Sequence, residues 1–129
     1  MSLESAVRAM LTTGTTLSNA GVADGNITHG YRQQSTALPA ITFELTQPQV
    51  LTIGDDLRRT TAEIRVIAET TNGALSIKDV VKPLCVPGSY DSMPFRAVQW
   101  LEYTVEPSVT AEGDENQPAQ IVCYVDITY

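Results

Sequence analysis

The chain has 129 residues, of which 43% are hydrophobic and 18% charged, with a formal net charge of −7 at pH 7. This length fits one domain, residues 1–129, with a single core. No apolar run reaches the roughly 18 residues of a membrane-spanning helix, and no basic segment leads into an apolar one as in a secretory signal. The acidic balance argues against a protein whose main task is to neutralise phosphates. We therefore expect a soluble, cytosolic domain without a membrane partner.

The charges are unevenly distributed along the chain. All 8 basic residues lie in the first 96 positions. Beyond them the charged residues are all acidic: Glu102, Glu106, Glu112, Asp114, Glu115 and Asp126. Two interpretations stay open, since such an end can serve solubility alone or can repel nucleic acid and meet a basic partner.

The N-terminal third predicts one helix and little other regular structure. Ser2 suits an N-cap, an apolar stripe runs from Leu3 to Leu11, and Gly14 suits the left-handed position after a helix. Residues 15–30 are polar and contain several glycines, which predicts a loop with at most one short strand near Ile27. Residues 32–37 are expected to continue this loop.

The middle of the chain predicts two strands and a second helix. In residues 38–46 and 57–70, apolar and polar side chains alternate, which is typical of antiparallel strands with one wet face. Asn72 suits the N-cap of a helix over residues 73–84, in which Pro83 falls in the last turn.

Two further strands are predicted over residues 95–106 and 119–128, and both have apolar residues of both parities. In the first strand, Val98 and Trp100 are expected on the opposite side from Tyr103. In the second, Val122 and Tyr124 are expected on the opposite side from the other apolar residues. Such strands are either central in a sheet or covered by a second surface. The predicted fold class is α+β: an antiparallel or mixed sheet of about four to five strands with two helices packed on one face.

The sequence contains no recognisable catalytic or metal-binding pattern. His29 is the one histidine, and Cys85 and Cys123 lack the spacing of metal ligands. The pair Asp55 and Asp56 lacks the alternating spacing of a calcium loop, and no phosphate-binding glycine loop is present. We expect no enzyme activity, no catalytic residue, no metal and no cofactor.

A possible interaction surface lies around a predicted turn at residues 54–56, between an apolar stretch and two arginines. One interpretation is a hairpin whose charges discourage aggregation. The other is an arm whose apolar residues dock on a neighbouring subunit while the arginines pair with carboxylates there. Together with two aromatic residues of the two-sided strands, the predicted interface comprises Val50, Leu51, Ile53, Asp55, Asp56, Arg58, Arg59, Trp100 and Tyr124.

Nearly the full chain resembles the small tail-terminator or tail-completion proteins of long-tailed bacteriophages. The similarity lies in the opening helix (residues 3–11), the first strand (37–43), the long strand and following helix (61–70 and 74–84), and the terminal strand (121–129). These are patterns of fold and include no catalytic signature.

The resemblance implies a mixed sheet with helices on one side and assembly into a homo-oligomeric, hexameric ring. Such a ring caps the head-proximal end of the tail tube, ends tube polymerisation and presents a surface to the head connector. The implied partners are the tail tube protein and the neck proteins, with DNA only as passing cargo, in a virion assembled in the host cytoplasm. The alternatives are a head–tail connector, a tail tube subunit or an unrelated assembly adaptor.

Overall fold

The computed structural model describes residues 2–30, 37–50, 57–106 and 118–129. Its main sheet has the strand order β1-β2-β4-β8-β7, and β3 also pairs with β4. Strands β1 and β2 are parallel, and the other pairs are antiparallel. The strands of this sheet are β1 (Ile27–His29), β2 (Ala40–Leu45), β3 (Gln49–Val50), β4 (Arg58–Ala68), β7 (Ala97–Glu106) and β8 (Ala119–Thr128).

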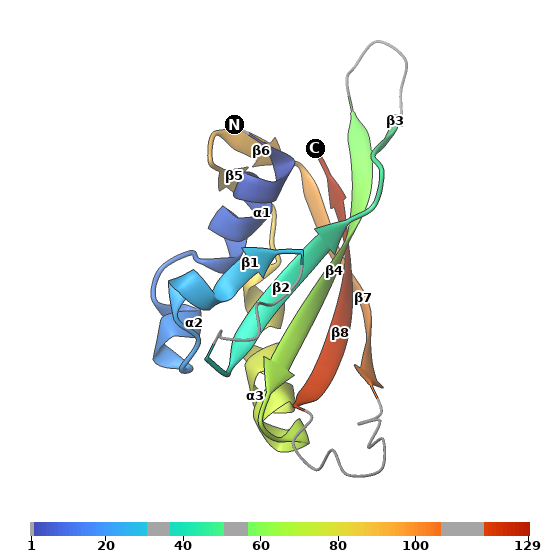
Figure 1. Ribbon diagram of the computed structural model, residues 1–129. Coiled ribbons are helices and arrows are strands. Elements are labelled where there is room, and N and C mark those ends of the chain that lie inside the picture. The colour runs from blue at the N-terminus through green and yellow to red at the C-terminus, as the bar shows by residue number, and fades with distance from the viewer. Residues whose placement is uncertain (1, 31–36, 51–56, 107–117) are drawn as a thin grey trace.

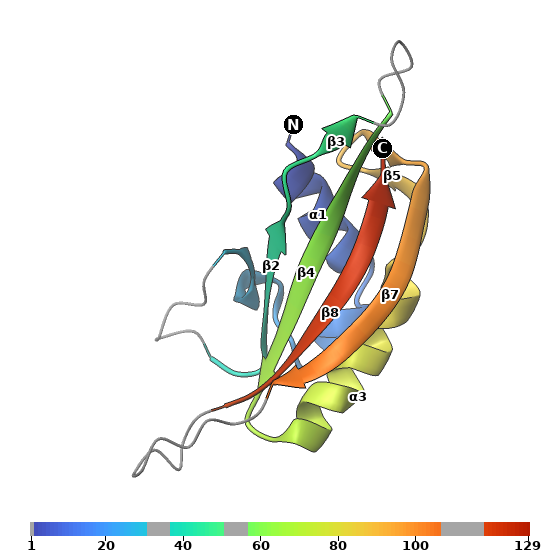
Figure 2. The same cartoon turned by 90° about the vertical axis from the view of Figure 1, so that its right-hand side faces the viewer.

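The helices lie on one face of the sheet, called here the helix face (Figure 1). They are α1 (Leu3–Leu11), α2 (Thr16–Asn19) and α3 (Thr71–Val81). Figure 2 looks onto the opposite face, called the open face, which none of these helices covers. The α+β class, the mixed sheet and the one-sided helices agree with the sequence. The counts do not, because the described chain has a sheet of six strands and three α-helices.

Helix α1 forms as predicted, and its ends and buried stripe follow from the sequence. The Ser2 hydroxyl accepts a hydrogen bond from the Ser5 backbone N–H, and the Ser5 hydroxyl accepts one from the Ser2 N–H, so two N-terminal donors are satisfied. Gly14 takes a φ of 64° just beyond the helix. The stripe of Ala6, Val7, Met10 and Leu11 is fully buried against the sheet.

Residues 15–30 contain the short strand predicted near Ile27, but the rest of the segment is more ordered than the predicted loop. They contain α2, a 3₁₀ turn at Asp24–Asn26 and the edge strand β1. Leu17, Val22 and Ile27, the large apolar residues of this mainly polar stretch, are buried and anchor the segment to the core. The Arg8 guanidinium donates hydrogen bonds to the carbonyl oxygens of Ile27 (3.2 Å) and Asp24 (2.8 Å), which holds β1 beside helix α1.

The centre of the sheet is the pair β4 and β8. Ala62, Ile64 and Val66 of β4 are fully buried on the helix face. The predicted apolar face of β8 is also fully buried there: Ile121, Cys123, Val125 and Ile127. Strand β8 is central, which explains why it is apolar on both sides.

Strand β7 departs from its predicted side-chain pattern because it contains a β-bulge. The register with β8 shifts between Trp100 and Glu102, so Leu101 is the extra residue. Trp100 pairs with Val125, and after the bulge Tyr103 pairs with Cys123. The bulge therefore places Trp100 and Tyr103 on the same helix face, although their parities differ.

The residues before β7 form a separate hairpin, which includes Phe95, the first residue of the predicted strand over residues 95–106. Strands β5 (Gly88–Tyr90) and β6 (Met93–Phe95) are joined by Asp91 and Ser92, which have φ values of 51° and 65°. Positive φ at both positions is typical of the tight turn that matches the twist of a hairpin. The Ser5 hydroxyl donates to the Asp91 carboxylate at 2.5 Å and so ties the turn to α1.

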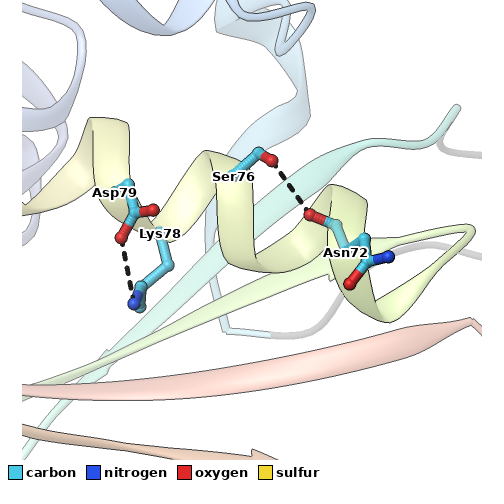
Figure 3. Close-up of polar contacts among 4 residues, drawn as sticks. All are labelled: Asn72, Ser76, Lys78 and Asp79. Carbon is cyan, nitrogen blue, oxygen red and sulfur yellow. Dashed lines mark hydrogen bonds and ion pairs between the residues drawn. The ribbon is translucent and has the colours of Figure 1, made fainter.

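The second helix begins two residues before the predicted position. Thr70, and not Asn72, is the N-cap, and its hydroxyl accepts a hydrogen bond from the Gly73 backbone N–H at 3.0 Å. The Asn72 carbonyl instead accepts from the Ser76 hydroxyl inside the helix (Figure 3). The α-helix ends at Val81 and continues as a 3₁₀ turn, Lys82–Leu84, that accommodates Pro83.

Replacing the two candidate caps separately distinguishes them. Thr70→Ala removes the cap hydrogen bond and is expected to lower the free energy of unfolding by about 1 kcal/mol. Asn72→Ala is expected to change it by no more than about 0.5 kcal/mol, since an exposed side chain without a structural contact is lost. Urea denaturation of both variants measures the difference, and an equal loss for both would contradict the assignment of Thr70.

Candidate interaction surfaces

The structure separates the predicted interface residues into three places. Val50, Arg58 and Arg59 lie where β3 meets β4, at the end of the sheet near the C-terminus (Figure 1). Trp100 lies on β7, and Tyr124 lies on the open face of β8. The remaining four predicted residues lie outside the described part of the chain: Leu51, Ile53, Asp55 and Asp56.

The first place is the rim of the sheet formed by β3 and the start of β4. Val50 pairs with Arg58 and Gln49 with Arg59. On its other side, the Arg58 backbone exchanges two hydrogen bonds of 2.8 Å with Tyr129. Val50 is 64% exposed, and both arginine side chains are exposed. Over the described residues, neither guanidinium group forms an ion pair. The rim therefore presents an exposed apolar side chain beside two exposed positive charges.

The second place is the outer edge of β7. This ten-residue strand pairs with β8 on one side, and its other side has no partner strand among the described residues. Leu101, Tyr103 and Val105 are 45%, 43% and 47% exposed. A long edge strand with exposed apolar side chains is a ready site for another chain. The two-sided pattern of this strand predicts either a central position or a covering surface, and the predicted interface includes only Trp100 from it.

Two lysines of the α3 region cover part of the β7 aromatic residues. The Lys78 ammonium lies 4.0 Å from the Tyr103 ring centroid, and that of Lys82 lies 5.9 Å from the Trp100 centroid. Lys78 also forms an ion pair with Asp79 at 3.0 Å (Figure 3). The hydrogen bond that the Lys78 ammonium donates to the Asp79 carboxylate raises the pKa of Lys78. The lysine stays charged at neutral pH, which favours its contact with the ring face.

The third place is the open face, whose surface is mainly polar. The Arg65 guanidinium donates to the Gln120 side-chain oxygen at 2.8 Å, and Thr61 donates to Asp126 at 2.6 Å. Tyr124 lies half-buried between these two contacts along β8. A hollow of about 550 Å³ lies on this face, lined by Gly30, Thr42, Glu44, Glu63, Arg65, Ile67 and Gln120.

The residues considered for catalysis do not form a reactive cluster in the described structure. His29 is exposed on the edge strand β1, with its ring centroid 5.4 Å from that of Phe43. Cys85 and Cys123 are buried free thiols, and burial raises the pKa of each to about 12. Within the described ranges, no group of three or more potential metal ligands comes together. None of the described helices has both the length and the apolar character needed to cross a bilayer.

The comparisons with known proteins bear on the fold. No family model matches the chain, and no curated protein matches it in sequence. A chain from the solved structure "Virion of native gene transfer agent (GTA) particle" aligns with a TM-score of 0.69, covering 98% of this chain and 92% of that chain. The two chains are 13% identical, so the likeness shows a shared fold. That fold extends over nearly the whole of both chains.

Because the two thiols are buried, we expect them to react slowly in the folded protein and the free energy of unfolding to fall at alkaline pH. Their pKa of about 12, against an ordinary 9.0, keeps them protonated in the folded protein at pH values at which the thiols of the unfolded chain already ionise. Stability from this source is therefore complete below pH 9 and is lost as pH rises towards 12. We expect labelling by an aromatic disulfide at pH 8 to be on the order of 100-fold slower in the native protein than in urea.

The double variant Cys85→Ala/Cys123→Ala tests the predicted loss of stability at alkaline pH. Its free energy of unfolding should fall less steeply between pH 9 and 12 than that of the parent chain, because two ionisations of the unfolded state are removed. Fast labelling of the native protein would contradict the burial of these thiols.

Proposed function

We propose that this protein is a structural subunit of a phage-type virion. The observation that carries the proposal is the fold shared with a chain of a gene transfer agent virion over 98% of the protein. The tail-terminator resemblance of the sequence supports the same class independently of that structure. The exposed apolar edges described above also suit a subunit whose surface is completed by neighbours.

More specifically, the protein forms a ring in the tail or neck, and a hexamer is the stoichiometry that the resemblance implies. The ring caps the head-proximal end of the tail tube, ends tube polymerisation and joins the tail to the head. Its partners are then the tail tube protein and the neck proteins, and it reaches the virion after assembly in the host cytoplasm. The wide separation of β3 and β7 supports a ring, because ring contacts use two different surfaces of one subunit.

The acidic character of the chain is compatible with DNA as passing cargo. Glu44 is exposed and lies on the open face beside Glu63, its cross-strand partner on β4. Carboxylates on a lumen wall repel phosphates, so DNA would pass such a wall without binding to it. This assignment makes the protein structural, without an enzyme activity, a metal or a cofactor.

The alternatives differ in how the subunits assemble. A head–tail connector also forms a closed ring, whereas a tail tube subunit stacks without limit and an adaptor forms a defined complex with another protein. Light scattering behind size exclusion, across protein concentration and at two salt levels, separates these cases. A closed species near 84 kDa, six times 14.0 kDa, is expected for the proposed ring.

Arg58→Glu is expected to shift this species towards monomer, because it reverses a positive charge on the exposed rim. Ala23→Glu, an exposed position in the segment before β1, controls for added negative charge and should assemble like the parent chain. Unlimited growth with concentration would instead support a tube subunit. Rings in electron micrographs that bind to the end of isolated tail tubes would support a terminator over a connector.

A further inference from the structure

The exposed apolar side chains lie mostly at two opposite edges of the main sheet. Among the described residues, the large hydrophobic side chains that are exposed are Val50, Val86, Leu101, Tyr103 and Val105. Val50 lies on β3, whereas the last three lie on β7, and strands β4 and β8 separate these two edges. One subunit therefore has two distinct apolar edges that cannot contact each other.

The apolar residues of the two edges lie on the same face of the sheet. Val50 is directly opposite Arg58, which has the parity of the buried Ala62 and so belongs to the helix face. Tyr103 and Val105 are opposite Cys123 and Ile121, which are buried on that face. Two copies placed edge to edge, with their helices on the same side, bring Val50 of one towards Tyr103 and Val105 of the other.

On the open face, the two edges carry charged residues of opposite sign. Arg59 has the parity of Glu63 and therefore lies on the open face beside β3. Glu102 is opposite Tyr124 and lies on the open face at the β7 edge. In the same placement β3 lies between Arg59 of one copy and Glu102 of the other, a span that a long guanidinium side chain can bridge across the open face, and this favours this partner and this orientation.

We propose that the β7 edge of one copy binds the β3 rim of the next, with Val50 against Tyr103 and Val105, and Arg59 against Glu102. The occupant of the exposed β7 edge is therefore a second copy of this chain. The contact is heterologous, since each subunit supplies a different edge to each neighbour, and it generates a closed ring when the rotation closes. This inference rests on the proposed function and names the surfaces that would build its ring.

The positions of the two edges along the strands determine how the subunits are inclined. Through the pairings of β4 and β8, the β3 rim is level with the first residues of β7, whereas Tyr103 lies about six residues further along. That offset is about 20 Å, and the step from β3 across the sheet to the next copy is about 19 Å. The strands of a ring closed in this way are inclined to its axis by about 45°.

Complementation between two blocked variants tests the heterologous contact. Val50→Glu removes the apolar side of the β3 rim, and Val105→Glu removes that of the β7 edge. Each variant alone is expected to be monomeric under conditions in which the parent chain assembles. An equimolar mixture retains one intact edge on each chain, so it should form a one-to-one dimer of about 28 kDa and nothing larger.

Val86→Glu is the matched control. It places the same charge at an exposed valine outside both edges, and it should assemble like the parent chain. All three valines are exposed, so each variant is expected to fold, and circular dichroism with urea denaturation checks this. A mixture that stays monomeric, or single variants that still assemble, would overturn the proposed contact.

A charge exchange tests the orientation. Arg59→Glu and Glu102→Arg should each weaken the contact by about two- to fivefold, as expected for an exposed pair. The double variant should return to within about twofold of the parent dissociation constant, because every contact then regains opposite charges. Additive losses in the double variant would contradict the pairing of these two residues.

The outcomes separate this inference from the proposed function. A closed ring of the parent chain that survives the valine substitutions would leave the ring in place and overturn these surfaces. Filaments that the same substitutions dissolve would support the contact and contradict the ring. A parent chain that stays monomeric at every concentration would overturn the contact between copies.

Discussion

The pairing of β4 with β8 is the constraint on which the rest of the fold depends. Ten consecutive residue pairs, from Arg59 with Thr128 to Ala68 with Ala119, hold the two longest central strands in one register. A slip of one residue would turn every apolar side chain of one strand to the open face. Because this register is set by burial on the helix face, it also determines which side chains reach the open face and the two edges.

An open sheet of this size necessarily has two edges, and the chain treats them differently. The short parallel strand β1 covers part of β2, and Arg8 of helix α1 donates hydrogen bonds to the carbonyl oxygens of Ile27 in that strand and of Asp24 just before it. The β7 edge has no such cover from the described chain, and its only device is the bulge at Leu101. Bulges can twist an edge away from unwanted partners. Here the bulge also gathers Trp100 and Tyr103 on one face.

Elements whose apolar pattern repeats over many residues were predictable from the sequence. The alternation in β4 and β8 and the stripe of α1 each depend on many residues, so one exception does not change the result. Features that depend on one residue were not predictable. Thr70 and Asn72 both suit an N-cap, and only the backbone shows that the hydroxyl of Thr70 reaches the Gly73 N–H. Leu101 reverses the parity of its strand without any local signal.

The interaction surface was predictable in part, for a related reason. A sequence shows that a strand is apolar on both sides, but it does not show whether the strand is central or at an edge. In β8 the second apolar side is explained by its central position, since Val122 is buried between neighbouring strands. In β7 the same kind of pattern leaves Leu101, Tyr103 and Val105 exposed. The strand order is what distinguishes a core residue from a candidate contact.

Charge sets a further condition on any assembly of this chain. Each subunit carries a formal charge of −7, so identical copies repel one another over distances up to the Debye length, about 8 Å at physiological ionic strength. Association then depends on apolar contact at short range and on local pairs of opposite charge, because the long-range term opposes it. Salt weakens the general repulsion and the local pair together. An apolar contact flanked by a single pair, as at Val50 and Arg59, is therefore better suited to assembly at physiological salt than an interface built mainly from ion pairs.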